Sequence, residues 1–188
     1  RQILSDLVKR NHNGEPSIYL QITRGVAPKR DQALPEQVIP TVFAMTSPLT
    51  PVDNALLETG VSVVTQEDIR WKHCNIKAIT LIANVLARQQ ALDEGAHDAI
   101  LIRDGEANEG AASNLFTVKN GLLKTPHKRF KLLPGITRDL VIELAQQHNL
   151  PYQETIITEE ELAQADEILL TSSTKEILPV TSLNEKPV

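Results

Sequence analysis

EANEGAASNLF (residues 106–116) and LLPGITR (residues 132–138) are the two runs of sequence that decide how this chain folds and what it binds. In the first run, small residues follow Glu109 and let a ligand approach the backbone closely. In the second run, Gly135 precedes the expected start of a helix, where free N–H groups and the Thr137 hydroxyl are suited to an anion. The stretch therefore predicts a carboxylate and an anion site that converge on one ligand.

Around this stretch, the pattern of apolar residues predicts a mixture of helices and strands. Helices are predicted over 1–10, 78–92 and 136–148, with a further short helix from residue 158, where a capping box begins. The first helix is expected to end at 11–14. Strands are predicted over 17–23, 38–45, 60–65, 99–103, 114–118, 122–125, 152–157, 168–171 and 177–181. The mixture indicates an α/β or α+β fold with a substantial mixed sheet.

Each of the two longest predicted helices is expected to present an apolar face to a core. The residues assigned to these faces are Ile79, Ile82, Val85 and Leu86 in the first helix, and Leu140, Val141, Leu144 and Ala145 in the second. A Rossmann fold and a P-loop are excluded, because no GxGxxG follows the first strand and GKT is absent.

The chain of 188 residues is long enough for one domain and part of another. Two prolines, Pro48 and Pro51, predict a stiff linker over 47–52, which separates 1–46 from 53–188. The chain starts in helical periodicity without a methionine and ends without a closing element. We therefore expect it to be a fragment of a longer protein.

Composition excludes several classes of function. The net charge of -5 and the absence of a basic run argue against nucleic acid or an anionic membrane as the main partner. The five histidines are dispersed, which argues against a metal site, and no GxSxG motif indicates a serine hydrolase. No apolar run reaches the length of a membrane-spanning helix. The single cysteine, Cys74, is expected to be a small, partly buried residue in a reducing compartment.

Three further positions carry candidate chemistry. Lys77 precedes an apolar helix, where desolvation would favour the neutral amine that a Schiff base requires; the alternative is an ordinary exposed lysine. Ser172 and Ser173 follow a predicted buried strand and offer hydroxyls to the anion near Gly135; the alternative is a polar turn. For Glu109, the alternative to a ligand-binding carboxylate is an acid in an exposed surface turn. Together, a lysine, an acid and a two-part anion site meet the needs of pyridoxal 5'-phosphate.

These residues resemble the signature of a known family. EGAASNLF (109–116), LKT (123–125) and LPGITR (133–138) are similar to the signature of the class IV pyridoxal-phosphate aminotransferases, which have fold type IV. DIRW (68–71) with CNIK (74–77), and TRGVAP (23–28), resemble the D-amino-acid branch of that family.

The resemblance implies a cytoplasmic homodimer of two-domain subunits with active sites near the interface. Residues 1–46 would be the end of the small domain, and 53–188 most of the large domain. Lys77 would be the catalytic residue and bind the cofactor covalently, and Glu109 would pair with its ring nitrogen. The remaining implied cofactor-binding residues are Leu133 under the ring, and Gly135, Ile136, Thr137, Ser172 and Ser173 around the phosphate.

The activity implied is transamination between a D-amino acid such as D-alanine and a 2-oxo acid such as 2-oxoglutarate. Arg30 and Gln32 would bind the substrate carboxylate, although Gln32 stands where the family has a histidine and the loop is one residue longer. Substrate choice is therefore less defined than the cofactor. The alternatives are branched-chain L-amino-acid transamination, aminodeoxychorismate lyase chemistry, an inactive fragment that survives as a folding or dimerisation domain, and a plain ligand-binding protein.

Overall fold

The protein forms two compact units, Arg1–Pro51 and Val52–Val188, in a computed structural model that describes residues 1–11, 15–129 and 131–188. Of the expected helix end at 11–14, Asn11 is the last described residue of the helix, and 12–14 lie outside the described residues. The boundary between the units falls within the segment predicted as a linker. The assignment of the two units to a small and a large domain stays a prediction.

The first unit contains one helix and a two-stranded antiparallel sheet. Its elements are α1 (Gln2–Asn11), β1 (Pro16–Thr23) and β2 (Thr41–Pro48). The strand β2 begins after Pro40 rather than at Val38, and it continues through Pro48. Proline has no N–H for a ladder, which explains why pairing starts beyond Pro40. The first two residues of the predicted linker are therefore part of a strand.

The second unit alternates strands and helices, and its elements match most of the predicted ones in place and type. The helices are α2 (Asn54–Thr59), α3 (Ile82–Asp93), α4 (Ile136–Gln147) and α5 (Glu159–Ala163). The strands are β3 (Val61–Glu67), β4 (Asp98–Arg103), β5 (Glu106–Gly110), β6 (Asn114–Lys119), β7 (Leu122–Pro126), β8 (Tyr152–Thr155), β9 (Glu167–Ser172), β10 (Glu176–Leu183) and β11 (Lys186–Pro187). The prediction of a mixed α/β fold is confirmed.

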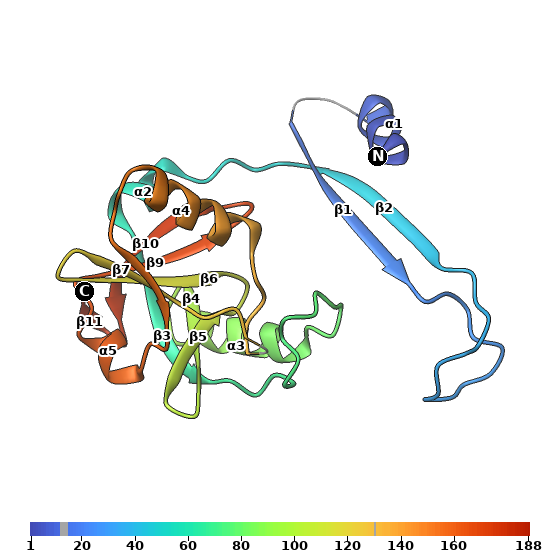
Figure 1. Cartoon of the computed structure of the whole chain (residues 1–188). Helices are drawn as coiled ribbons and strands as arrows, with labels where there is room; N and C mark the ends of the chain where they lie inside the picture. Colours follow the sequence, from blue (N-terminus) through green and yellow to red (C-terminus); the bar gives the residue numbers. More distant parts are fainter. Residues whose placement is uncertain (12–14, 130) are drawn as a thin grey trace. The chain divides into compact units, whose positions relative to one another are not determined.

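Six of these strands pair in a closed ring, in the order β3, β4, β5, β6, β9, β10 and back to β3. The pairs β3–β4 and β10–β3 are parallel, and the other four are antiparallel. The strand β7 extends the sheet beside β6, and β8 pairs in parallel with β7. Figure 1 shows the strands curling around one another with the helices outside them.

The core of this unit draws on every strand of the ring. Its apolar cluster comprises Val61, Val63, Ile100, Ala107, Leu115, Ile157, Leu162, Ile168, Leu170, Leu178, Val180 and Leu183. Small side chains make a second cluster beneath α3, including Ala87, Ala91 and Ala99. Because these side chains are short, α3 packs closely against the adjacent strands β3 and β4.

The structure corrects the faces predicted for the two long helices. Residues 78–81 are not helical, and the side chains of Ile79, Ile82, Val85 and Leu86 are exposed, while Ala87 and Ala91 face the sheet. In α4, Leu140 and Leu144 are exposed, Val141 is half-buried, and Ala145 is buried together with Ile142 and Arg138. Periodicity located both helices, but each has two apolar faces, and the pattern does not say which one meets the sheet.

The short-range signals are confirmed. Positive φ angles at Asp104 (56°) and Gly105 (74°), and at Asn120 (51°) and Gly121 (76°), form the expected tight hairpin turns. The capping box at the start of α5 is present, with both of its reciprocal hydrogen bonds. Among the described residues, no helix is both long and apolar enough to span a membrane.

Candidate active site

Glu109 is buried in β5, with only 5% of its surface exposed. The register between β4 and β5 shifts, because Leu101 is opposite Glu109 whereas Ile102 is opposite Ala107. The extra residue is Asn108, and such a bulge changes the direction of the neighbouring side chain. The Glu109 Oε2 atom accepts hydrogen bonds from the Leu133 backbone N–H (3.0 Å) and from Asn114 Nδ2 (3.3 Å).

Asn114 connects several of the predicted site residues. Its Nδ2 also donates to the Leu133 carbonyl oxygen at 2.7 Å. Its Oδ1 lies 2.1 Å from where a Cβ atom on Gly135 would be, so a larger residue there would displace the Asn114 side chain from this position. In the sheet, Asn114 is opposite Thr171, the residue before Ser172. The structure thus brings Glu109, Leu133 and Gly135 around Asn114, at the end of the ring where Ser172 lies.

The N-terminus of α4 begins directly after Gly135, which provides no side-chain cap. The first N–H groups of a helix have no intrahelical partner, so those of Ile136 and Thr137 remain suited to an anion. Arg138 anchors this helix end. Its side chain is fully buried, and its Nη2 donates to the Pro126 carbonyl (2.8 Å) and to Glu154 (2.5 Å).

Ser172 and Ser173 lie at the turn between β9 and β10, where the Ser172 hydroxyl accepts a hydrogen bond from the Lys175 N–H at 3.2 Å. Ser172 lines a cavity of about 190 Å³ with Thr174, Lys175, Ser113, Arg88 and other residues. The buried Ser113 hydroxyl has no hydrogen-bond partner among the described residues. The cavity is also lined by Asp98, which pairs with Arg88 at 3.4 Å, so of the two cations only Lys175 is left without a carboxylate partner there in the described part of the chain.

Lys77 lies in the loop between β3 and α3, and its side chain is exposed. Within the described part of the chain it makes no hydrogen bond or ion pair. The sequence predicts that apolar neighbours desolvate the Lys77 amine. In the described chain this prediction is wrong, because the neighbouring side chains of Ile79 and Ile82 are exposed and do not cover the amine. No contact joins Lys77 to Glu109 among these residues.

The predicted substrate-binding residues, Arg30 and Gln32, belong to the first unit. Both are exposed in the loop between β1 and β2. The adjacent Asp31 forms an ion pair of 3.3 Å with Lys29 and accepts a hydrogen bond from the Ala33 N–H at 3.2 Å. Arg30 is therefore left available for a ligand from outside this loop.

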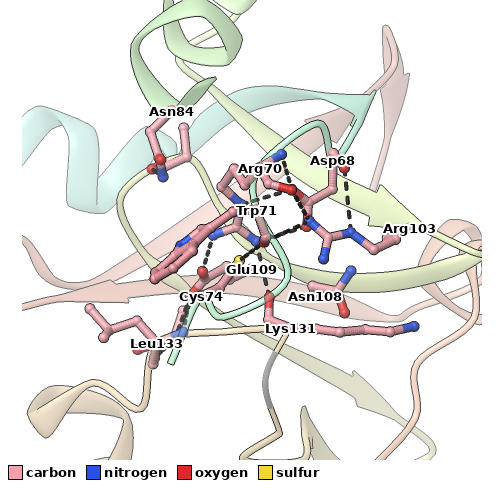
Figure 2. A network of polar contacts seen from close by, with 12 residues as sticks. Asp68, Arg70, Trp71, Cys74, Asn84, Arg103, Asn108, Glu109, Lys131 and Leu133 are labelled. Atoms are coloured by element: carbon pink, nitrogen blue, oxygen red, sulfur yellow. Dashed lines mark hydrogen bonds and ion pairs between the residues drawn. The ribbon is translucent and has the colours of Figure 1, made fainter. Parts of the chain in front are cut away.

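Sequence reasoning missed a network of buried charges beside Glu109 (Figure 2). The guanidinium of Arg70 contacts Glu109 Oε1 and forms two hydrogen bonds with Asp68, of 2.8 and 2.9 Å. It also donates to the Lys131 carbonyl at 3.1 Å. Arg103 reaches Asp68 from the other side at 2.9 Å. The signal in the sequence is a pair of opposite charges, Asp68 and Arg70, two residues apart directly after a strand.

The network shifts the pKa values of both acids. Burial raises the pKa of the Glu109 carboxyl, and the charge and hydrogen bond of Arg70 oppose that rise. Burial also acts to raise the pKa of Asp68, but hydrogen bonds and charge from Arg70, with the charge of Arg103, outweigh it and lower that pKa. Arg70 thus favours the ionised form of both carboxyl groups, although only the pKa of Asp68 falls below its ordinary value, and that of Glu109 stays raised.

Cys74 is buried, in line with the sequence-based expectation of a small, at least partly buried residue. Its thiol donates to the Trp71 carbonyl at 3.0 Å, and burial raises its pKa, so it is not an activated nucleophile. Residues 1–11, 15–129 and 131–188 contain no cluster of three or more His, Cys, Asp or Glu side chains suited to a metal ion.

Comparison with known proteins yields close sequence relatives. A D-alanine aminotransferase of Bacillus licheniformis is 38% identical over 185 residues, which are 98% of this chain and 65% of that protein. A D-alanine aminotransferase of Staphylococcus aureus (strain COL) is 38% identical over 183 residues, covering 97% of this chain and 64% of that protein. The chain therefore spans about two thirds of the length of these relatives.

Solved structures share the fold across different activities. A Legionella pneumophila protein designated a 4-amino-4-deoxychorismate lyase superposes with a TM-score of 0.87 at 26% identity, over 99% of this chain and 68% of that one. The branched-chain amino acid aminotransferase of Escherichia coli gives a TM-score of 0.85 at 27% identity, over 97% and 62%. The sequence model for amino-transferase class IV matches residues 1–183. The chain belongs to the class IV aminotransferase family, which has fold type IV.

Proposed function

We propose that the intact protein is a pyridoxal-phosphate enzyme that transfers an amino group between a D-amino acid, such as D-alanine, and a 2-oxo acid, such as 2-oxoglutarate. The relatives at 38% identity that are named D-alanine aminotransferases support this reaction. The observation that carries the proposal is the arrangement around Asn114, which holds a buried carboxylate close to an uncapped helix N-terminus.

The residues present fit the cofactor. The start of α4, where a Cβ atom on Gly135 would be blocked by Asn114, is suited to a phosphate, with Ile136 and Thr137 providing N–H groups. Ser172 and Ser173 would add hydroxyls. Leu133, fixed through its backbone to Glu109 and Asn114, would pack against the ring.

The cofactor, when bound, supplies a ring that accepts electrons from the Cα–H bond of the amino acid. The chain's own residues provide the rest. Glu109 would accept a hydrogen bond from the ring nitrogen and so hold a proton on it. Lys77 would bind the cofactor through its amino group. Once released, it would act as the general base that takes the proton from Cα and as the general acid that delivers it to the C4′ position of the cofactor.

The complete protein would supply the remaining parts of the site. We propose that it is a cytoplasmic homodimer, in which Arg30 and Gln32 bind the carboxylate of the substrate. An arginine can form two hydrogen bonds with a carboxylate, and Arg30 is exposed for that role. Because Gln32 carries no charge, the carboxylate would depend mainly on Arg30.

The deciding test is the Lys77→Ala variant of the intact protein. We expect transamination of D-alanine with 2-oxoglutarate to fall at least about a hundredfold, because a general base is lost. Borohydride reduction in the presence of pyridoxal phosphate should label the peptide that contains Lys77 in the wild type only. Lys72→Ala, which removes an exposed lysine of the same loop, is the matched control and should retain both properties.

The same assays decide between related reactions. L-leucine and aminodeoxychorismate serve as competing substrates, because solved structures with this fold include a branched-chain enzyme and a protein designated as a lyase. Labelling of Lys77 with no turnover of any substrate would favour a remnant without activity. Retained transamination in Lys77→Ala would overturn the proposal.

A further inference from the structure

Glu109 has one cationic neighbour in the part of the chain that the structure describes, and it is Arg70. The two oxygen atoms of the Glu109 carboxyl have different partners. Oε1 contacts the Arg70 guanidinium, and Oε2 accepts from the Leu133 N–H and from Asn114, which are neutral. The side chains of Arg70 and Glu109 are each only 7% exposed, so water contributes little to their solvation.

A buried carboxylate needs a compensating charge, since desolvation otherwise favours its protonated form. The chemistry proposed for Glu109 requires the ionised form, because a protonated acid would not hold a proton on the ring nitrogen. Hydrogen bonds from Leu133 and Asn114 fix the direction of the carboxyl group without neutralising it. The charge that balances Glu109 therefore comes from Arg70.

Arg70 is in turn held in place by the other members of the network. Asp68 is completely buried at its side chain and binds Arg70 through two hydrogen bonds. Arg103 pairs with Asp68 and also donates to the carbonyl of Arg70 at 2.9 Å. Figure 2 shows the resulting row of alternating charges, which links the end of β3 with β4 and β5. A guanidinium bound to several acceptors has little freedom to turn away from Glu109.

We propose that Arg70, oriented by Asp68, is a positioning residue that fixes both the direction and the negative charge of Glu109. Arg70 touches neither substrate nor cofactor in this role and acts only through Glu109. The inference rests on the proposed function of Glu109 as the partner of the ring nitrogen. Its physical content, an arginine that keeps a buried acid ionised, is measurable in the protein without cofactor.

The test follows the Glu109 carboxyl directly in the intact protein. Infrared difference spectra between the wild type and Glu109→Gln isolate this one carboxyl, and a pH series without cofactor gives its titration midpoint. In Arg70→Gln we expect the midpoint to move to higher pH. The dissociation constant of pyridoxal phosphate should rise about tenfold, the equivalent of one pKa unit. Arg70→Lys keeps the charge but not the fork of hydrogen bonds, and it should recover part of both changes.

Two control variants separate this effect from a general change of charge. Arg103→Gln removes a guanidinium that contacts Asp68 but not Glu109. Lys131→Gln removes a cation whose side chain pairs with Asp104 and Glu106. Lys131→Gln should leave the midpoint of Glu109 close to that of the wild type, and Arg103→Gln, which acts on Glu109 only by loosening Arg70, should shift it less than Arg70→Gln does. An equal shift in these controls and in Arg70→Gln would overturn the proposal.

If Arg70→Gln does not fold, the double variant Arg70→Gln/Asp68→Asn replaces it, because it removes both charges of the buried pair together. The midpoint should again be raised, and an unchanged midpoint in either variant would overturn the inference. Failure of the wild type to bind pyridoxal phosphate would instead refute the proposed function. The cofactor-free titration would still report whether Arg70 controls the charge of Glu109.

Discussion

Glu109 lies between a guanidinium, an amide and a backbone N–H, and its replacement tests the proposed chemistry at the scale of one residue. Glutamine in its place retains acceptors for Leu133 and Asn114 but carries no charge to hold a proton on the ring nitrogen. We expect Glu109→Gln to lower the rate of transamination by about a hundredfold or more, since it removes an electrostatic contribution to the transition state. Steady-state kinetics with D-alanine and 2-oxoglutarate measure this, and a rate equal to that of the wild type would contradict it.

His97 provides a residue-scale prediction on stability. Burial, with the nearby charges of Lys175 and Arg88, lowers its pKa below the ordinary 6.5. Below pH 6.5 the unfolded chain therefore binds more protons than the folded one, so the free energy of unfolding falls as the pH decreases through this region. Urea unfolding between about pH 8 and pH 5 should show a shallower decline for His97→Gln than for the wild type. Parallel declines would show that His97 does not contribute.

Individual residues differ in how far the sequence could identify them. Glu109 and Gly135 were identifiable because a small-residue run and a helix start are local signals. Arg70 was not, since its importance comes from contacts with Glu109 and the Lys131 carbonyl, which are distant in the chain. Lys77 was a candidate from its place before an apolar helix, and the resemblance strengthened it, but its exposure depends on packing that no local pattern specifies.

At the scale of elements, the position of α4 depends on Arg138. This buried side chain joins the first turn of α4 to Pro126 in β7 and Glu154 in β8. We expect Arg138→Met to lower the free energy of unfolding by about 2–3 kcal/mol, because the hydrogen bonds of a buried guanidinium to Pro126 and to the partly exposed Glu154 are lost. Binding of pyridoxal phosphate should also weaken, since the helix N-terminus is no longer held. Urea unfolding and a fluorescence titration measure the two effects.

The matched control for Arg138→Met is the substitution Lys128→Met. Lys128 pairs with Asp139 of the same helix at 2.8 Å, but both side chains are 46% exposed. Exposed ion pairs contribute little, so Lys128→Met should change the free energy of unfolding by less than about 1 kcal/mol. Equal losses in the two variants would mean that the burial of Arg138 is not what anchors α4.

The helix α3 shows what periodicity provides and what it omits. An apolar repeat indicated a helix, yet two faces of α3 are apolar, one with small side chains and one with large ones. The sheet takes the small face, through Ala87 and Ala91, because short side chains let the helix approach β3 and β4 closely. Hydrophobicity alone favoured the larger residues, Val85 and Leu86, which are exposed. The choice depends on the shape of the partner surface.

At the scale of the whole molecule, the closed ring of strands was not predictable from the sequence. Strand positions follow from alternation and turn residues, but β6 pairs with β9 across the intervening β7, α4, β8 and α5. Such pairing depends on contacts between distant segments, which leave no local pattern. The mixed fold class was predictable because it requires only the types of element and their order.

The exposed face of α3 leads to a prediction about assembly. Ile82, Val85 and Leu86 are 68%, 58% and 53% exposed, an apolar surface typical of a site for a protein partner. We expect the proposed homodimer of the intact protein to bury it. Val85→Lys would place a charge in that interface, where desolvation is costly, and should raise the dimer dissociation constant at least about tenfold.

Val85→Leu is the matched control, because it keeps an apolar side chain of similar size and should leave the dimer unchanged. Sedimentation equilibrium of the intact protein measures both variants against the wild type. Since Val85 is mostly exposed and lies outside the buried clusters of the described chain, circular dichroism should show the same helix content in all three proteins. A dissociation constant for Val85→Lys equal to that of the wild type would place the dimer interface elsewhere and leave this face to another part of the intact protein.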